Sequence, residues 1–162
     1  MTHELRRSDL AITDPSEIDR ILSAARYATV ALADRDQPYL VTLSCGYDPT
    51  ARRLCFHVAA RGRKLDIIAR NPRACVTVIG DLGYLHGECA HPYESVVMDG
   101  RMRLLDDPGD VRCAMRTLIG QLETPDAAGE IFEQHGLDGD AALLRFRLLT
   151  FEIESVTAKR GQ

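Results

Sequence analysis

Basic side chains gather in one short stretch of an acidic chain, and their spacing suits the binding of an anion. The 162 residues carry a formal net charge of −4. The stretch crosses a predicted strand end, a turn and a helix start, where backbone amides and the helix dipole attract negative charge. A phosphate would fit there, although a solvated charged turn explains the charges equally well. The basic residues are Arg52, Arg53, Arg61, Arg63 and Lys64, and the turn glycine is Gly62.

His57 lies close to this basic turn, on the strand that leads into it. Side chains alternate along a strand, so Leu54, Phe56 and Val58 share one face while Cys55 and His57 share the other. A histidine titrates near neutral pH and can act as a general acid or base. The alternative is a structural histidine, and the residues alone favour neither interpretation.

The preceding strand offers small polar side chains on one face. Thr42, Ser44 and Gly46 share that face, whereas Val41 and Leu43 point the other way. Small polar groups beside a phosphate site leave room and hydrogen-bonding partners for a flat heterocycle. A strand side that faces solvent is the other interpretation.

Metal binding is not predicted. Cys89 and His91 supply two ligands in one loop, whereas a structural zinc site needs four well-placed ones. The cysteines show no CxxC spacing, so we expect reduced and mostly buried thiols. They are Cys45, Cys55, Cys75, Cys89 and Cys113.

Composition narrows the class of partner. A sequence pI near 5.7 argues against a general affinity for nucleic acids, whose phosphates attract basic proteins. The longest apolar runs, 40–43 and 96–98, are too short to cross a bilayer, and the N-terminus lacks a signal-peptide pattern. We therefore expect a cytoplasmic protein with a small-molecule partner and no membrane or nucleic-acid contact.

The pattern of elements predicts one mainly β domain over residues 1–162. An N-cap acid and a proline at 14–15 start a short helix. Antiparallel strands with a few short helices favour a closed or half-closed barrel. The expected strands are 27–32, 39–47, 54–58, 74–79, 93–105 and 143–156, the expected helices are 64–70 and 108–122, and 81–91 is a loop.

Two features of the late strands suggest irregular pairing. Gly100 is expected to bend the strand that contains it. In the last strand, apolar residues change parity between Leu148 and Leu149. Such a change is typical of a β-bulge or of a strand that passes a barrel corner.

The order of these segments resembles a known family. The chain is similar to the FMN-binding split barrels of the pyridoxamine 5'-phosphate oxidase-like superfamily, and within it to the nitroimidazole-resistance (Nim) branch. The resemblance implies an antiparallel split β-barrel with short flanking helices, and a homodimer that holds two flavins at its interface. It rests on segments 38–43, 54–59, 62–64 and 71–72, and on 93–101 with its Asp99-Gly100 pair.

The resemblance also implies roles for single residues. Lys64 corresponds to a ligand of the cofactor phosphate, and His57 to a catalytic histidine beside the flavin. Thr42, Leu43 and Ser44 would lie along the ring, and Tyr93 and Ser95 would approach the site from one subunit or the other. Many relatives carry hydroxyl residues at the positions of Val58 and Gly62, so here the Gly62 amide and the Arg61 or Arg63 guanidinium would take their place.

The implied function is that of an FMN-dependent oxidoreductase, a flavin reductase, oxidase or nitroreductase acting on a small molecule at the dimer interface. Three alternatives stay open. The protein could bind flavin or haem without robust turnover, with His57 or His91 as the axial haem ligand; it could use a deazaflavin; or it could be a dimeric structural module. The tail 157–162 carries no specific substrate motif, which argues against a pyridoxamine-phosphate oxidase in the strict sense.

Overall fold

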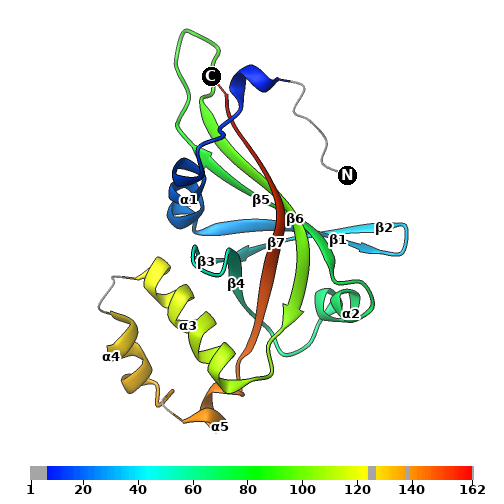
Figure 1. The fold of residues 1–162 in the computed structure, drawn as a ribbon, viewed down its shortest axis with the longest axis vertical. Coiled ribbons are helices and arrows are strands. Elements are labelled where there is room, and N and C mark those ends of the chain that lie inside the picture. The colour runs from blue at the N-terminus through cyan, green and yellow to red at the C-terminus, as the bar shows by residue number, and fades with distance from the viewer. Residues whose placement is uncertain (1–6, 124–126, 138, 162) are drawn as a thin grey trace.

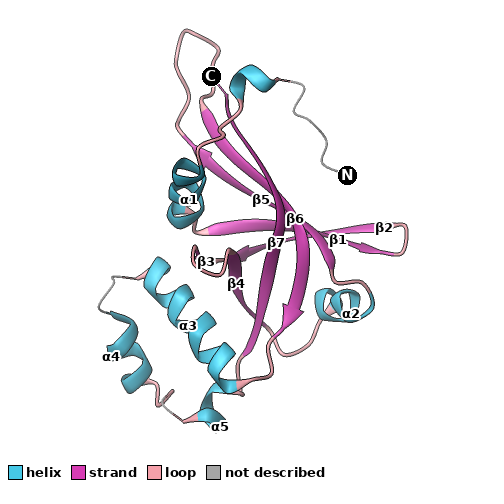
Figure 2. Ribbon diagram, in the orientation of Figure 1, coloured by secondary structure: helices cyan, strands magenta, loops and turns pink. Residues whose placement is uncertain are grey.

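A computed structural model describes residues 7–123, 127–137 and 139–161. Within them, seven antiparallel strands form one sheet in the order β2-β1-β5-β6-β7-β4-β3. The sheet curls into a half-barrel flanked by helices (Figures 1 and 2), which confirms the expected split barrel. The strands are β1 (Tyr27–Asp34), β2 (Gln37–Ser44), β3 (Gly46–Asp48), β4 (Arg53–Val58), β5 (Arg73–Asp81), β6 (Tyr93–Leu104) and β7 (Arg147–Gly161).

The α-helices lie in three places around the sheet. One covers the start of β6, one follows β4, and a group of three lies beside β4 and β7 (Figure 2). Among the described residues, no helix is long and apolar enough to cross a membrane. The helices are η1 (Ser8–Leu10, a 3-10 turn), α1 (Pro15–Ala24), α2 (Arg63–Arg70), α3 (Pro108–Leu122), α4 (Ala127–Gln134) and α5 (Asp140–Leu143).

The predicted strand 39–47 is in fact two strands, β2 and β3, with only Cys45 between them. Cys45 is fully buried, and its amide donates to the Arg26 carbonyl. Gly46 lies so close to α3 that a Cβ there would be 2.8 Å from the Cα of Leu118. The break therefore turns the chain from one sheet edge to the other and seats β3 against α3.

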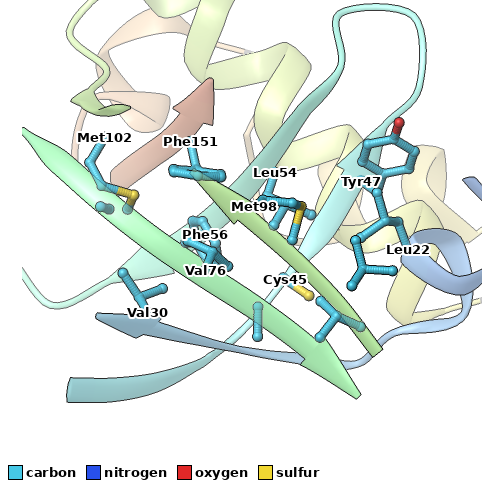
Figure 3. Close-up of a cluster of buried hydrophobic side chains, with 14 of the residues drawn as sticks. Leu22, Val30, Cys45, Tyr47, Leu54, Phe56, Val76, Met98, Met102 and Phe151 are labelled. Carbon is cyan, nitrogen blue, oxygen red and sulfur yellow. The ribbon is translucent and has the colours of Figure 1, made fainter. Parts of the chain in front are cut away.

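Two apolar clusters occupy the two faces of the sheet. The inner core fills the barrel with side chains such as Val30, Phe56, Met98 and Phe151 (Figure 3). The helix-side core lies under α3, α4 and α5, and is formed by Cys55, Leu105, Val111, Ala114, Met115, Leu118, Phe132, Leu137, Leu143 and Leu148.

β7 contributes to both clusters, and this corrects the interpretation of its parity change. Leu149 and Phe151 face the inner core, whereas Leu148 faces the helix-side core. Both faces are buried here, so the apolar run needs no bulge at that point. The strand also begins at Arg147 rather than at residue 143, because residues 140–143 form α5.

A register shift does occur further along the β6–β7 pair. Asp99 pairs with Ser155 while Gly100 pairs with Ile153, which leaves Glu154 as the extra residue of a bulge. A Cβ at Gly100 would lie 2.0 Å from the Glu152 carbonyl oxygen. The expected irregularity at Gly100 is thus a close approach of two backbones.

Gly100→Ala is expected to lower the free energy of unfolding by about 3 kcal/mol, because an added methyl group forces the two strands apart. Chemical denaturation of both proteins measures the difference. Gly120→Ala is the matched control, since nothing lies within 4 Å of a Cβ there. Alanine inside α3 is expected to be neutral or to stabilise by up to about 1 kcal/mol. Equal stability of Gly100→Ala and the wild type would contradict the prediction.

A buried carboxylate fastens α1 to the sheet. Glu94 on β6 is 6% exposed, and Arg20 of α1 donates to both its oxygens at 2.8 and 2.7 Å. Arg160 of β7 donates to Glu94 and also to Glu17 of α1. These bonds, that from Arg20 first, lower the pKa of Glu94 below its ordinary value of 4.5. α1 itself begins as predicted, with the Asp14 carboxylate accepting from the amide of residue 16 at 2.9 Å.

Candidate functional site

A pocket of about 670 Å³ lies between strands β2 and β4 and helices α3 and α4, and we call it the larger pocket. This volume falls in the range of sites that hold small molecules and cofactors. Four of the predicted site residues come together in it: Thr42, Leu43, Ser44 and His57. The complete lining is Tyr27, Thr42, Leu43, Ser44, His57, Met115, Leu118, Ile119, Leu122, Glu123, Ile131 and His135.

The strand wall of the pocket carries the polar groups. Strand pairing places Thr29 opposite Thr42, and their hydroxyl oxygens lie 3.0 Å apart. His57 points to the helix side of β4, away from the fully buried Phe56, as the alternation predicted. Its ring stands 5.6 Å from that of Phe146, centroid to centroid, at an angle of 54°. This aromatic contact orients an imidazole that remains exposed to the pocket.

The helix wall is apolar, and sequence reasoning did not assign it to the site. Met115, Leu118, Ile119 and Leu122 of α3 follow the spacing of one helix face, and all four line the pocket. The spacing of these four apolar residues can be recognised in the sequence, but it is equally typical of a helix that only packs on the core. The strand wall thus presents hydroxyl and imidazole groups and the face of α3 presents aliphatic groups, while Glu123 and His135 add polar groups to the remaining lining.

His135 is the second histidine of the pocket and was also missed. It directly follows α4, and its amide donates to the carbonyl of Ile131, which lines the same pocket. Glu123, the residue that follows α3, also lines the pocket. No pattern between residues 122 and 143 predicts an element, so nothing in the sequence indicated these two residues.

The basic turn lies outside this lining but is linked to it through β2. Gly62 caps α2 with φ 144° and supplies no side-chain acceptor. Its carbonyl accepts from the amide of Leu65 at 2.9 Å, so the amides of Arg63 and Lys64 are the ones that an anion would meet. The Arg63 guanidinium stacks 4.9 Å from the Tyr39 ring centroid. Thr42 follows three residues later, about 10 Å along the strand. Arg61 and Lys64 belong to the same turn, and their role as phosphate ligands stays a prediction.

Tyr93 and Ser95 lie at the start of β6, where they pair with Gly161 and Lys159 of β7. Tyr93 borders a separate pocket of about 380 Å³ together with Ile79, Asp81 and His91. Ser95 is 7% exposed within the sheet. The structure does not bring these two residues to the larger pocket within one protomer, so their contact with a ligand stays a prediction.

His91 forms a local pair rather than part of the larger pocket. Its Nε2 lies 3.0 Å from the Asp81 carboxylate. The amide of Gly83, and after it His91, lower the pKa of Asp81. Over the part of the chain that the structure describes, no three His, Cys, Asp or Glu side chains are placed to share a metal ion.

The sequence profile of the pyridoxamine 5'-phosphate oxidase family matches residues 14–160. The chain belongs to this family. The match covers every strand of the half-barrel except the last residue of β7. It confirms the predicted family membership. No curated protein sequence is detectably similar to this family member.

Solved structures with the same fold span nearly the whole chain. A candidate 5-nitroimidazole antibiotic resistance protein from Bacteroides thetaiotaomicron has a TM-score of 0.73 at 21% identity, covering 98% of this chain and 96% of its own. A FAD-binding protein from Mesorhizobium loti has 0.61 at 27%, covering 94% and 97%. A flavocytochrome from Azotobacter vinelandii has 0.77 at 19%, covering 99% and 73%. These likenesses place the chain in the pyridoxamine 5'-phosphate oxidase-like fold.

Proposed function

We propose that this protein binds flavin mononucleotide in the larger pocket and works as an FMN-dependent oxidoreductase on a small molecule. The proposal rests on one observation. Four predicted site residues line one pocket opposite the apolar face of α3: Thr42, Leu43, Ser44 and His57. Similar structures described as a FAD-binding protein and a flavocytochrome support it. A flavin reductase, an oxidase and a nitroreductase all fit this site.

The residues present suit a flavin at both of its ends. A flat ring fits between the hydroxyls of the strand wall and the aliphatic side chains of α3. The uncapped N-terminus of α2 with Lys64 suits the phosphate. β2 is an edge of the sheet and passes both places, so one ligand lying along this edge would reach the strand wall and the basic turn.

The outer face of the sheet, which points away from the inner core, supports a homodimer. Large apolar side chains are exposed on it, including Tyr27 (63%), Leu40 (64%), Ile79 (66%) and Val97 (38%). Exposed apolar surface of this kind is typical of protein interfaces. Tyr27 also lines the larger pocket. A second copy seated on this face would therefore border the pocket, and the flavin would touch both subunits.

When bound, flavin supplies the transfer of hydride or electrons, while the protein supplies orientation and electrostatics. In this chain the His57 imidazole is placed to hold or deliver a proton beside the ring. Met115, Leu118 and Ile119 would exclude water from the side of the ring opposite the strand wall. The hydroxyls of Thr42 and Ser44 orient the polar edge of the ligand.

The absorption spectrum of the purified protein tests the proposal directly. Flavin mononucleotide is added in excess, the sample is desalted, and the visible spectrum is recorded, with FAD and a deazaflavin treated in parallel. Two flavin bands retained after desalting, in a species that sediments as a dimer, are the expected result. A colourless protein after every treatment would overturn the proposal.

Haem binding is the second candidate function, because two histidines, His57 and His135, line the same pocket. Imidazole nitrogens are common axial ligands of haem iron. One of the similar structures is a flavocytochrome. A Soret band after addition of haemin, lost in His57→Ala or His135→Ala, would favour this function over flavin binding.

Lys64→Ala is expected to weaken the binding of flavin mononucleotide by about 1.5 to 3 kcal/mol, the worth of a hydrogen bond to a charged group. Fluorescence titration measures the dissociation constant. Riboflavin, which lacks the phosphate, is expected to bind both proteins equally. Arg70→Ala is the matched control, since Arg70 ends the same helix and pairs with Asp34 at 2.9 Å. Unchanged affinity for flavin mononucleotide would remove Lys64 from the phosphate site.

A further inference from the structure

The side chain of Gln121 joins α3, which forms one wall of the larger pocket, to β3 and to the end of α1. Its Oε1 accepts from the amide of Tyr47 at 2.6 Å. Its Nε2 donates to the carbonyls of Leu22 at 3.1 Å and Ala25 at 2.5 Å. Figure 1 shows α1, β3 and the end of α3 close together. One side chain therefore uses its oxygen and both amide hydrogens to hold three backbone groups.

The backbone groups that Gln121 binds lie where regular structure ends. β3 is an edge strand of the described sheet, so an amide that points outward from it meets no further strand. The carbonyls of Leu22 and Ala25 lie at the end of α1, and the last carbonyls of a helix lack partners within it. These contacts are partly buried. Loss of the Gln121 amide would therefore cost free energy, because polar groups would lose their hydrogen bonds away from bulk water.

The residues tied by Gln121 lie next to residues that line the larger pocket. Ala25 precedes Tyr27 by two residues, and Tyr27 pairs with Ser44 across β1 and β2. Both Tyr27 and Ser44 line the pocket. On α3, Leu122 follows Gln121 directly and lines the pocket from the helix side. Gln121 thus ties the helix wall to the strand wall at the end of the pocket where Tyr27 and Ser44 meet.

A second polar contact in this region does not involve α3. The Tyr47 hydroxyl donates to the Asp19 carboxylate of α1 at 2.7 Å, and Tyr47 is 6% exposed. This bond joins β3 to α1 only. Tyr47→Phe removes it while the backbone amide that Gln121 binds remains. The variant is therefore a matched control for the loss of one partly buried hydrogen bond.

We infer that Gln121 is a positioning residue for the larger pocket: its three hydrogen bonds fix the helix wall relative to the strand wall. The effect on a ligand rests on the proposed function, in which a flavin ring lies between these two walls. Binding is tighter when a site is already ordered, so release of α3 is expected to weaken flavin binding. The position of α3 itself can be followed by hydrogen exchange without any ligand.

The first test uses Gln121→Met, which keeps the length of the side chain and removes all three hydrogen bonds. In the ligand-free variant, hydrogen exchange measured by mass spectrometry is expected to be about tenfold faster in peptides from α3 and β3. The dissociation constant of flavin mononucleotide, measured by fluorescence titration, is expected to rise about tenfold. Tyr47→Phe is expected to leave both exchange in α3 and flavin affinity unchanged.

Gln121→Glu provides a second test, which depends on pH. The new carboxylate can accept from the Tyr47 amide, but its other oxygen faces the carbonyls of Leu22 and Ala25 without a hydrogen to donate. Those carbonyl oxygens favour the protonated carboxyl group, which donates one hydrogen bond there. Relative to the wild type at the same pH, exchange and flavin affinity are therefore expected to recover as pH falls from about 8 to about 5. Gln121→Met is expected to show no such recovery.

Two results would overturn the inference. One is equal exchange in α3 for Gln121→Met and the wild type, and the other is faster exchange with an unchanged flavin affinity. A wild-type protein that binds no flavin would refute the proposed function instead, and exchange in the ligand-free variants would then decide the inference alone. Circular dichroism verifies that each variant is folded. If Gln121→Met does not fold, the pH response of Gln121→Glu decides the question.

Discussion

His57→Ala is expected to slow the reduction of a nitroaromatic or quinone acceptor by about 100-fold, the usual worth of a positioned acid or base. The protein is loaded with flavin mononucleotide, reduced by light, and mixed with the acceptor in a stopped-flow instrument. Recovery of the visible flavin band gives the rate. This design requires no knowledge of the physiological electron donor.

The melting temperature separates catalysis from packing. His57 is exposed and contacts only one aromatic ring that the structure records, Phe146, so its loss is expected to change the melting temperature by less than about 2 °C. His91→Ala is the matched control, because His91 is exposed and pairs with Asp81 outside the larger pocket. An unchanged rate in His57→Ala, or loss of folding, would assign His57 a structural role.

Glu94→Ala is expected to lower the free energy of unfolding by about 2 to 3 kcal/mol, because it removes the buried acceptor of hydrogen bonds from two arginines. Arg20 would lose its carboxylate partner, Arg160 would keep only Glu17, and α1 would lose its main polar tie to β6. Glu154→Ala is the control: Glu154 pairs with Arg101 and Arg73, but it is 44% exposed. A loss of only about 0 to 1 kcal/mol is expected there. Similar losses in both variants would contradict the buried role of Glu94.

The lowered pKa of Glu94 also predicts how the stability of the protein depends on pH. Its pKa in the folded protein is lowered from 4.5, so the unfolded chain binds a proton more tightly than the folded one. The stabilisation from Glu94 is therefore fully present above its unfolded pKa and is lost as pH falls through the folded pKa. Urea denaturation between neutral pH and pH 3 is expected to show a smaller acid loss in Glu94→Ala than in the wild type.

Local chemistry predicted those elements whose boundaries are set by their own residues. Asp14 and Pro15 start α1, and α3 spans 108–122 as expected. The elements that were wrong or missed depend on distant contacts. β2 and β3 separate at Cys45 because Gly46 must lie against the backbone of α3, and no residue near 45 signals that contact.

The same distinction holds for the candidate site: some of its residues were predicted from the sequence, and others depend on contacts between distant segments. Alternation along β4 placed His57 correctly, and family resemblance pointed to Thr42 and Ser44. The helix wall was missed because a stripe such as Met115 to Leu122 is equally typical of a core helix. His135 was missed because its segment showed no clear pattern. A site assembled from a sheet edge and a helix becomes visible only when both are placed in space.

β7 is buried on both of its faces, and this affects how the chain folds while it is being synthesised. β7 pairs with β6 on one side and β4 on the other, and it follows all the other strands in the sequence. A nascent chain therefore exposes apolar surface from both cores, and the open edges of β4 and β6, until β7 leaves the ribosome. Unpaired edges of this kind promote aggregation. Translation speed over the last strand, and chaperones that shield the growing chain, are thus expected to govern the yield of folded protein.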